Sequence, residues 1–104
     1  MSKGKADSGD AIPDGIEFTL SRPVQAHGED LSALNFRAPA TRDLRTLGNP
    51  LIFRDDGSFS FDNDKMAKFM VHLGKVPMST VDQMAPGDFN AAAMELASAF
   101  FSTG

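Results

Sequence analysis

The residues that could do chemistry are few and stand far apart along the chain. His27 and His72 are the two histidines, and there is no cysteine. A metal site would need carboxylates brought to these two rings by the fold, so surface positions are the better interpretation of both. Without a thiol, disulfides, thiolate catalysis and cysteine-ligated zinc are excluded. We therefore expect no metal site.

Four aspartates lie close together in the middle of the chain: Asp55, Asp56, Asp62 and Asp64. A twelve-residue calcium loop needs Gly at its sixth position and Glu at its last, and no segment here meets both requirements. General acid–base catalysis needs two carboxylates in differently tuned environments, and no acid stands beside a recognisable partner motif. Roles in turns and helix caps account for the four aspartates. A glycine-rich phosphate loop and a nucleophile elbow are also missing, so we predict no enzyme, no catalytic residue and no cofactor.

Apolar, adaptable side chains are the more informative feature. The chain has six methionines, and methionine is favoured where a surface must accept varied apolar partners. Adjacent helical residues point about 100° apart, so Phe100 and Phe101 cannot both centre on one buried face. Side chains off the main apolar stripes are candidates for an exposed patch. The predicted partner-binding residues are Met78, Met84, Met94 and Phe101.

Length and charge limit the class of protein. A chain of 104 residues with 41% hydrophobic residues supports one compact core. No apolar run approaches the roughly 20 residues of a membrane span, and the polar start lacks a secretory signal, so we expect a cytoplasmic protein without membrane contact. The net charge is −4, and its positive residues look scattered. The one basic cluster, Arg37, Arg42 and Arg45, is too small for nucleic-acid binding.

The hydrophobic pattern of the first half indicates strands. Residues 1–15 have almost nothing to bury and are predicted to be a disordered N-terminal arm, followed by a single domain over residues 16–104. Apolar residues then alternate with polar ones, Pro23 requires an edge or a bend, and Gly28 suits a turn. The sequence predicts a small antiparallel meander from residues 16–20, 24–26 and 34–38.

The second half follows helical spacing. Thr41 and Asp62 are predicted N-caps, Gly74 a helix end, and Ser79 with Asp82 resembles a capping box. Pro86 suits the first residue of a last helix. Between the first two helices, Asp56-Gly57 suits a type I′ turn in a hairpin over residues 51–61. The predicted core is Phe18, Leu20, Leu34, Phe36, Leu44, Phe69, Leu73, Phe89, Leu96 and Phe100.

We therefore predict the α+β class, with a small N-terminal antiparallel β meander followed by three to four short helices. Two segments add a family resemblance. The run from Ile16 through Gly28 to Leu44, with its Phe36-Arg37-Ala38-Pro39 segment, resembles the start of the phage tail assembly chaperones of Mu-like and P2-like phages. Residues 73–89, ending in Ala85-Pro86-Gly87-Asp88-Phe89, resemble that family's closing pattern. The resemblance covers roughly residues 16–101.

The resemblance implies a late protein that binds and solubilises the tape-measure protein during tail morphogenesis in the host bacterial cytoplasm. The tail-tube protein is a further candidate partner. An alternative is a minor structural subunit retained in the phage tail. A DNA-binding regulator is disfavoured by the acidic charge.

Overall fold

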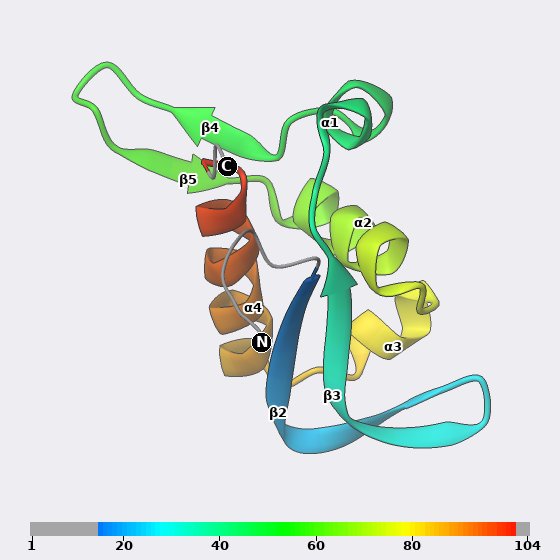
Figure 1. Cartoon of the computed structure of the whole chain (residues 1–104). Helices are drawn as coiled ribbons and strands as arrows, with labels where there is room; N and C mark the ends of the chain where they lie inside the picture. Colours follow the sequence, from blue (N-terminus) through cyan, green and yellow to red (C-terminus); the bar gives the residue numbers. More distant parts are fainter. Residues whose placement is uncertain (1–14, 102–104) are drawn as a thin grey trace, which may run out of the picture.

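The computed structural model describes residues 15–101 and confirms the α+β class (Figure 1). An antiparallel hairpin comes first, followed by helices and by a second, smaller hairpin between the first two helices. In chain order the elements are β2 (Gly15–Ala26), β3 (Glu29–Arg37), α1 (Thr41–Leu47), β4 (Leu51–Phe53), β5 (Phe59–Phe61), α2 (Asn63–Gly74), α3 (Met78–Asp82) and α4 (Pro86–Ala99).

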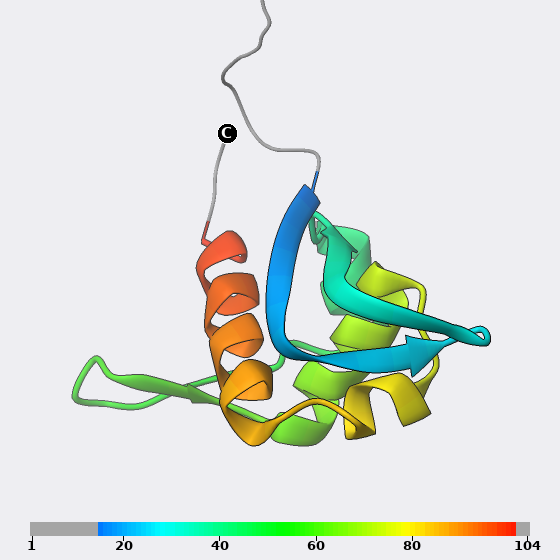
Figure 2. The same cartoon turned by 90° about the horizontal axis from the view of Figure 1, so that it is seen from below.

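The expected meander is one long hairpin, because the segments on either side of Pro23 belong to the same strand. Strand β2 pairs antiparallel with β3, and the register shifts between Thr19 and Val24. Proline has no N–H for the ladder, so an irregularity is the natural place for it. At this point β2 bends, and the end of the hairpin turns toward α3 (Figure 2).

The two hairpins use different turns. His27 and Gly28 both have positive φ, 54° and 79°, as a two-residue type I′ turn requires. In the loop between β4 and β5 only Gly57 has positive φ, and its N–H bonds the Arg54 carbonyl at 3.1 Å. This is a type I turn followed by a left-handed glycine, so the predicted type I′ turn at Asp56-Gly57 is wrong.

Side chains from the helical half bond to the backbone of β2. Asp88 accepts from the Ser21 N–H at 2.9 Å. At Gln25 the N–H donates to Gln83 Oε1 at 2.7 Å, and the carbonyl accepts from Thr80 Oγ1 at 2.6 Å. These bonds fix α3 and the start of α4 beside the bend of the first hairpin.

The helix starts agree with the sequence in part. Asp62 caps α2, accepting from the Lys65 N–H at 3.0 Å, and Pro86 is the first residue of α4.

The N-cap of α1 is Ala40 instead of Thr41, because the Asp43 carboxylate bonds the Ala40 N–H at 2.8 Å. Pro77 precedes α3 without a side-chain cap, so the predicted capping box at Ser79 does not form.

The end of α2 differs from the prediction by one residue. Gly74 is still helical, and Lys75 takes the left-handed conformation with φ of 55°. Gly74 has a packing role, since a Cβ at this position would lie 3.2 Å from the ring of Phe36. The glycine lets α2 approach β3 closely.

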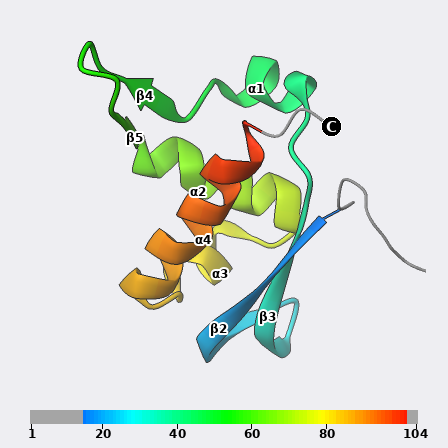
Figure 3. The same ribbon diagram turned by 60° about the vertical axis from the view of Figure 1, so that its left-hand side comes forward.

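The core lies between the first hairpin and the helices, with α4 crossing α2 (Figure 3). Leu34, Phe36, Phe69 and Leu96 are at most 1% exposed. Phe18, Leu20 and Leu73 are also buried, whereas the other predicted core residues, Leu44, Phe89 and Phe100, are half-buried and pack against the core. The predicted N-terminal arm lies outside the described residues, except Gly15, which already belongs to β2.

Candidate functional site

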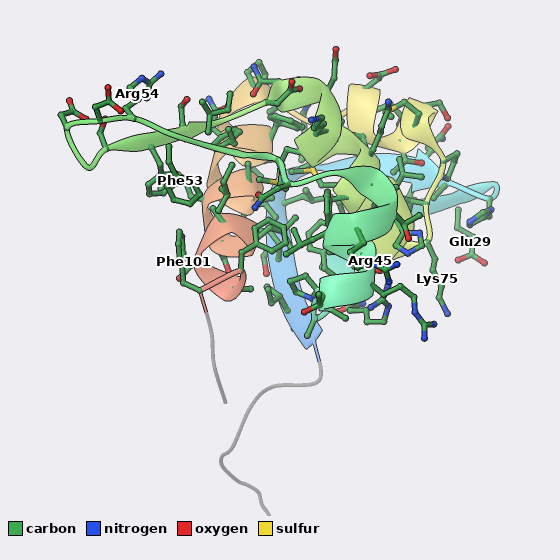
Figure 4. The ribbon with its side chains drawn as sticks, turned by 90° about the horizontal axis from the view of Figure 1, so that it is seen from above. Glu29, Arg45, Phe53, Arg54, Lys75 and Phe101 are labelled. Atoms are coloured by element: carbon green, nitrogen blue, oxygen red, sulfur yellow. The ribbon has the colours of Figure 1, made fainter. Side chains whose placement is uncertain are left out.

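Three aromatic rings gather on the surface where the second hairpin meets the end of α4. Phe53, Phe59 and Phe101 have ring centroids 5.9 to 6.3 Å apart, in tilted and edge-to-face arrangements. Their exposed fractions are 59%, 37% and 53%. Figure 4 shows the Phe53 and Phe101 side chains beside each other beneath the hairpin. We call these three residues the aromatic cluster.

The alternation of side chains along β4 and β5 explains why the rings of Phe53 and Phe59 lie on the same face of the second hairpin. Leu51 pairs with Phe61, and Phe53 pairs with Phe59. Because side chains alternate along a strand, these four residues share one face of the hairpin. Leu51 is buried and Phe61 half-buried, so the core continues outward into the aromatic cluster.

The end of α4 supplies the third ring. Phe100 turns into the core and packs edge-on against Phe69, with centroids 5.2 Å apart, while Phe101 turns to the surface. The expected division between two adjacent phenylalanines is confirmed. Met94, 53% exposed, lies on α4 seven residues before Phe101, which follows the end of the helix. Helix α4 thus adds a further exposed apolar side chain about two turns before the aromatic cluster.

Two of the four residues predicted to bind a partner, Met94 and Phe101, are exposed, on α4 and just after it. Met78 is exposed, as expected, but it begins α3, on the other side of α2 from the aromatic cluster. Met84 was expected to be exposed, and this is wrong: only 5% of it is accessible. The Met84 N–H bonds the Val81 carbonyl, and this turn after α3 directs the side chain into the core.

Sequence reasoning missed the contribution of the second hairpin. Phe53 and Phe59 lie at the ends of three-residue strands, and their alternation with Ile52 and Ser60 was the available signal. Nothing in that pattern indicated that the hairpin projects beyond the core. Ile52 is also exposed, on the opposite face from Phe53.

A buried carboxylate on α1 is bonded to side chains from β3 and α2. Asp43 on α1 accepts two bonds of 3.0 Å from Arg37 at the end of β3, and His72 Nε2 of α2 lies 3.1 Å from Asp43 Oδ1. Hydrogen bonds from Arg37 are the main reason that the pKa of Asp43 falls from 3.8 to about 2, against the opposing effect of burial. The same pairing raises the pKa of Arg37. This arrangement joins β3, α1 and α2.

The positive charges are less scattered than the sequence suggested. On α2, Lys65 and Lys68 fall at i and i+3, which lie on one side of a helix, and Lys75 follows the last residue of α2. Helix α1, which packs against α2, adds Arg42 and Arg45. All five side chains are exposed. The expectation of scattered positive charge is therefore wrong for this side of the molecule.

Both histidines are exposed, as expected. Within residues 15–101, no group of three His, Cys, Asp or Glu residues could hold a metal ion. No helix in this part of the chain is long and apolar enough to cross a membrane.

Comparison with known proteins identifies a family. The model of a family described as phage tail assembly chaperone proteins, E, or 41 or 14, matches residues 17–101. No curated protein and no solved structure matches the chain. The matched region runs from β2 to the aromatic cluster and covers well over half of the sequence. The chain belongs to the phage tail assembly chaperone family.

Proposed function

We propose that this chaperone binds and solubilises the tape-measure protein during tail morphogenesis, in the cytoplasm of the bacterial host. The aromatic cluster together with Met94 is the proposed client surface. One observation carries the proposal: three aromatic rings that contact one another are exposed to solvent, next to the core. The chain that presents them belongs to the chaperone family. Exposed apolar patches of this kind mark interaction sites in soluble proteins.

The chemistry of this surface suits an apolar helix. Aromatic rings contribute large apolar area with few rotatable bonds, and the unbranched Met94 side chain adapts to varied neighbours. An amphipathic helix is recognised when its apolar face enters such a surface. Client binding of this type needs no catalytic residue and no cofactor, so the chain acts as a binding protein.

Co-purification tests the proposal. Met94→Ser with Phe101→Ser removes two exposed apolar side chains and should abolish co-purification of the tape-measure protein, while the circular dichroism spectrum stays unchanged. The control is Ile52→Ser, which removes an exposed apolar side chain on the opposite face of the second hairpin and should keep client binding. Met78→Ser is measured separately, because Met78 is itself a predicted partner-binding residue. Equal client binding by the first variant and the wild type would place the client surface elsewhere. Loss of binding by Met78→Ser would support the predicted contribution of Met78.

The alternative function is a minor structural subunit of the tail. Mass spectrometry of purified particles separates the two, because a chaperone is absent from finished particles and a subunit remains. Co-purification with the tail-tube protein in the same variants tests the second candidate partner.

A further inference from the structure

We propose that the exposed cations of α1 and α2 form a second docking surface, which binds an acidic segment of a protein. We call Arg42, Arg45, Lys65, Lys68 and Lys75 the basic face. It lies apart from the aromatic cluster, because Arg45 and Lys75 are on one side of the molecule and Phe53 and Phe101 are on the other (Figure 4). This inference concerns a second partner and does not depend on the proposed client surface.

The packing of the two helices is what assembles this face. Asp43 in the first turn of α1 bonds His72 near the end of α2. At the other end, a Cβ on Gly48, the residue after α1, would lie 3.4 Å from Lys65 Nζ. The two helices therefore run antiparallel and present their cations side by side. Figure 4 shows Arg45 and Lys75 on the same side of the molecule.

Asp43, the acid buried beneath the basic face, does not neutralise the positive charge that the face presents to solvent. Asp43 is enclosed, with 6% of its side chain exposed, and is already paired with Arg37 and His72. The five exposed cations are half of the ten in a chain with fourteen acidic residues. An acidic protein thus keeps half of its positive charge on α1, on α2 and at the residue after α2, and a surface of this kind attracts an acidic partner by complementary potential.

The limits of the face favour an acidic protein segment over a nucleic acid. Lys65 and Lys75 are ten residues apart, which is about 15 Å along a helix. Acids stand at both ends: Asp62 and Asp64 at the start of α2, and Glu29 beside Lys75, where His27 of the same turn lies 3.3 Å from the Lys75 carbonyl. A duplex carries charge continuously, about one per 1.7 Å, and would extend over these acids. A short acidic segment fits between them.

Fluorescence anisotropy with two probes tests the inference: a labelled twenty-residue polyglutamate peptide and a twenty-base-pair DNA duplex, each at 50 and 300 mM NaCl. We expect the full chain to bind the peptide at 50 mM, more tightly than the duplex, and to bind it at least tenfold more weakly at 300 mM because exposed charges are screened. Arg45→Glu with Lys68→Glu should weaken peptide binding at least tenfold.

Arg22→Glu with Arg54→Glu is the matched control, since it changes the net charge equally at exposed positions outside the basic face. This control should weaken peptide binding less than threefold. Equal weakening by the two variants would show that net charge alone matters and would overturn the inference. Absence of peptide binding at 50 mM would also overturn it, and tighter binding of the duplex would replace it with a nucleic-acid surface. Retained co-purification of the tape-measure protein by the basic-face variant would show that the two surfaces act separately.

Discussion

Replacing Asp43 by Asn should destabilise the fold more than the loss of one surface charge would. The carboxylate accepts two bonds from Arg37 and one from the Ala40 N–H, and it also contacts His72. An amide of the same size is neutral, and because both oxygens of Asp43 accept from Arg37, either orientation of the amide turns its NH2 donor toward the guanidinium. Asn therefore keeps the packing but loses the charge-assisted bonds.

The structure sets the magnitude of this effect. Breaking a fully buried ion pair costs about 3–5 kcal/mol. Here Arg37 and His72 are 43% and 47% exposed, so water can solvate the freed cations. The fall in the pKa of Asp43 from 3.8 to about 2, discounted for this screening, corresponds to about 1–2 kcal/mol. We expect a loss of about 2 kcal/mol once the weakened cap of α1 is included, which lowers the Tm by about 10 °C in a domain of this size.

The sign of the pH dependence follows from the lowered pKa. The stabilisation by Asp43 is complete above the unfolded-state pKa near 4 and is lost as the pH falls toward 2, where the folded carboxylate becomes protonated. Urea unfolding of the wild type and Asp43→Asn at pH 7 and at pH 2.5 measures this difference. Asp55→Asn, at an exposed position in the second hairpin, is the control and should stay close to the wild type. A difference below about 0.5 kcal/mol at pH 7, or one equally large at pH 2.5, would refute the reasoning.

Two further predictions concern packing. Phe36→Ala and Leu96→Ala should each reduce the free energy of unfolding by about 2–5 kcal/mol in urea titrations, because both side chains are fully enclosed; a cost under about 0.5 kcal/mol at both would contradict the assigned core. Gly74→Ala should give no gain in Tm, because the new methyl group meets the Phe36 ring, whereas Gly87→Ala in α4, with nothing within 4 Å, should gain about 0.5–1 kcal/mol. An equal gain in stability from both substitutions would show that the Phe36 ring moves aside without cost and would contradict this prediction.

Local patterns in the sequence predicted the elements well and their ends less well. Alternation of Ile16, Phe18 and Leu20 located β2, and Asp62 located the start of α2. The exact caps depend on tertiary contacts. Because Asp43 bonds the Ala40 N–H, Ala40 is the N-cap of α1, and Gly74 packs closely against Phe36 while Lys75 takes the left-handed position.

The candidate surfaces were only partly predictable, because they join residues from separate elements. Helical spacing separates Phe100 from Phe101, a local property, and that prediction is confirmed. Met84 follows the short helix α3, and its burial is determined by a turn that no periodic pattern reveals. The meeting of Phe53 and Phe101, far apart in the sequence, depends on how the second hairpin packs on α4.

The bonds from the helical half to β2 have a consequence for the protein at high concentration. A strand with free N–H and C=O groups along its outer side is a template for pairing with another chain, and this is a common start of aggregation. Asp88, Gln83 and Thr80 occupy such groups at Ser21 and Gln25, beside the bend that interrupts the regular ladder. An incoming strand from a second copy therefore finds the backbone groups at Ser21 and Gln25 already bonded. Strand pairing at this part of β2 would first have to break these bonds to α3 and α4.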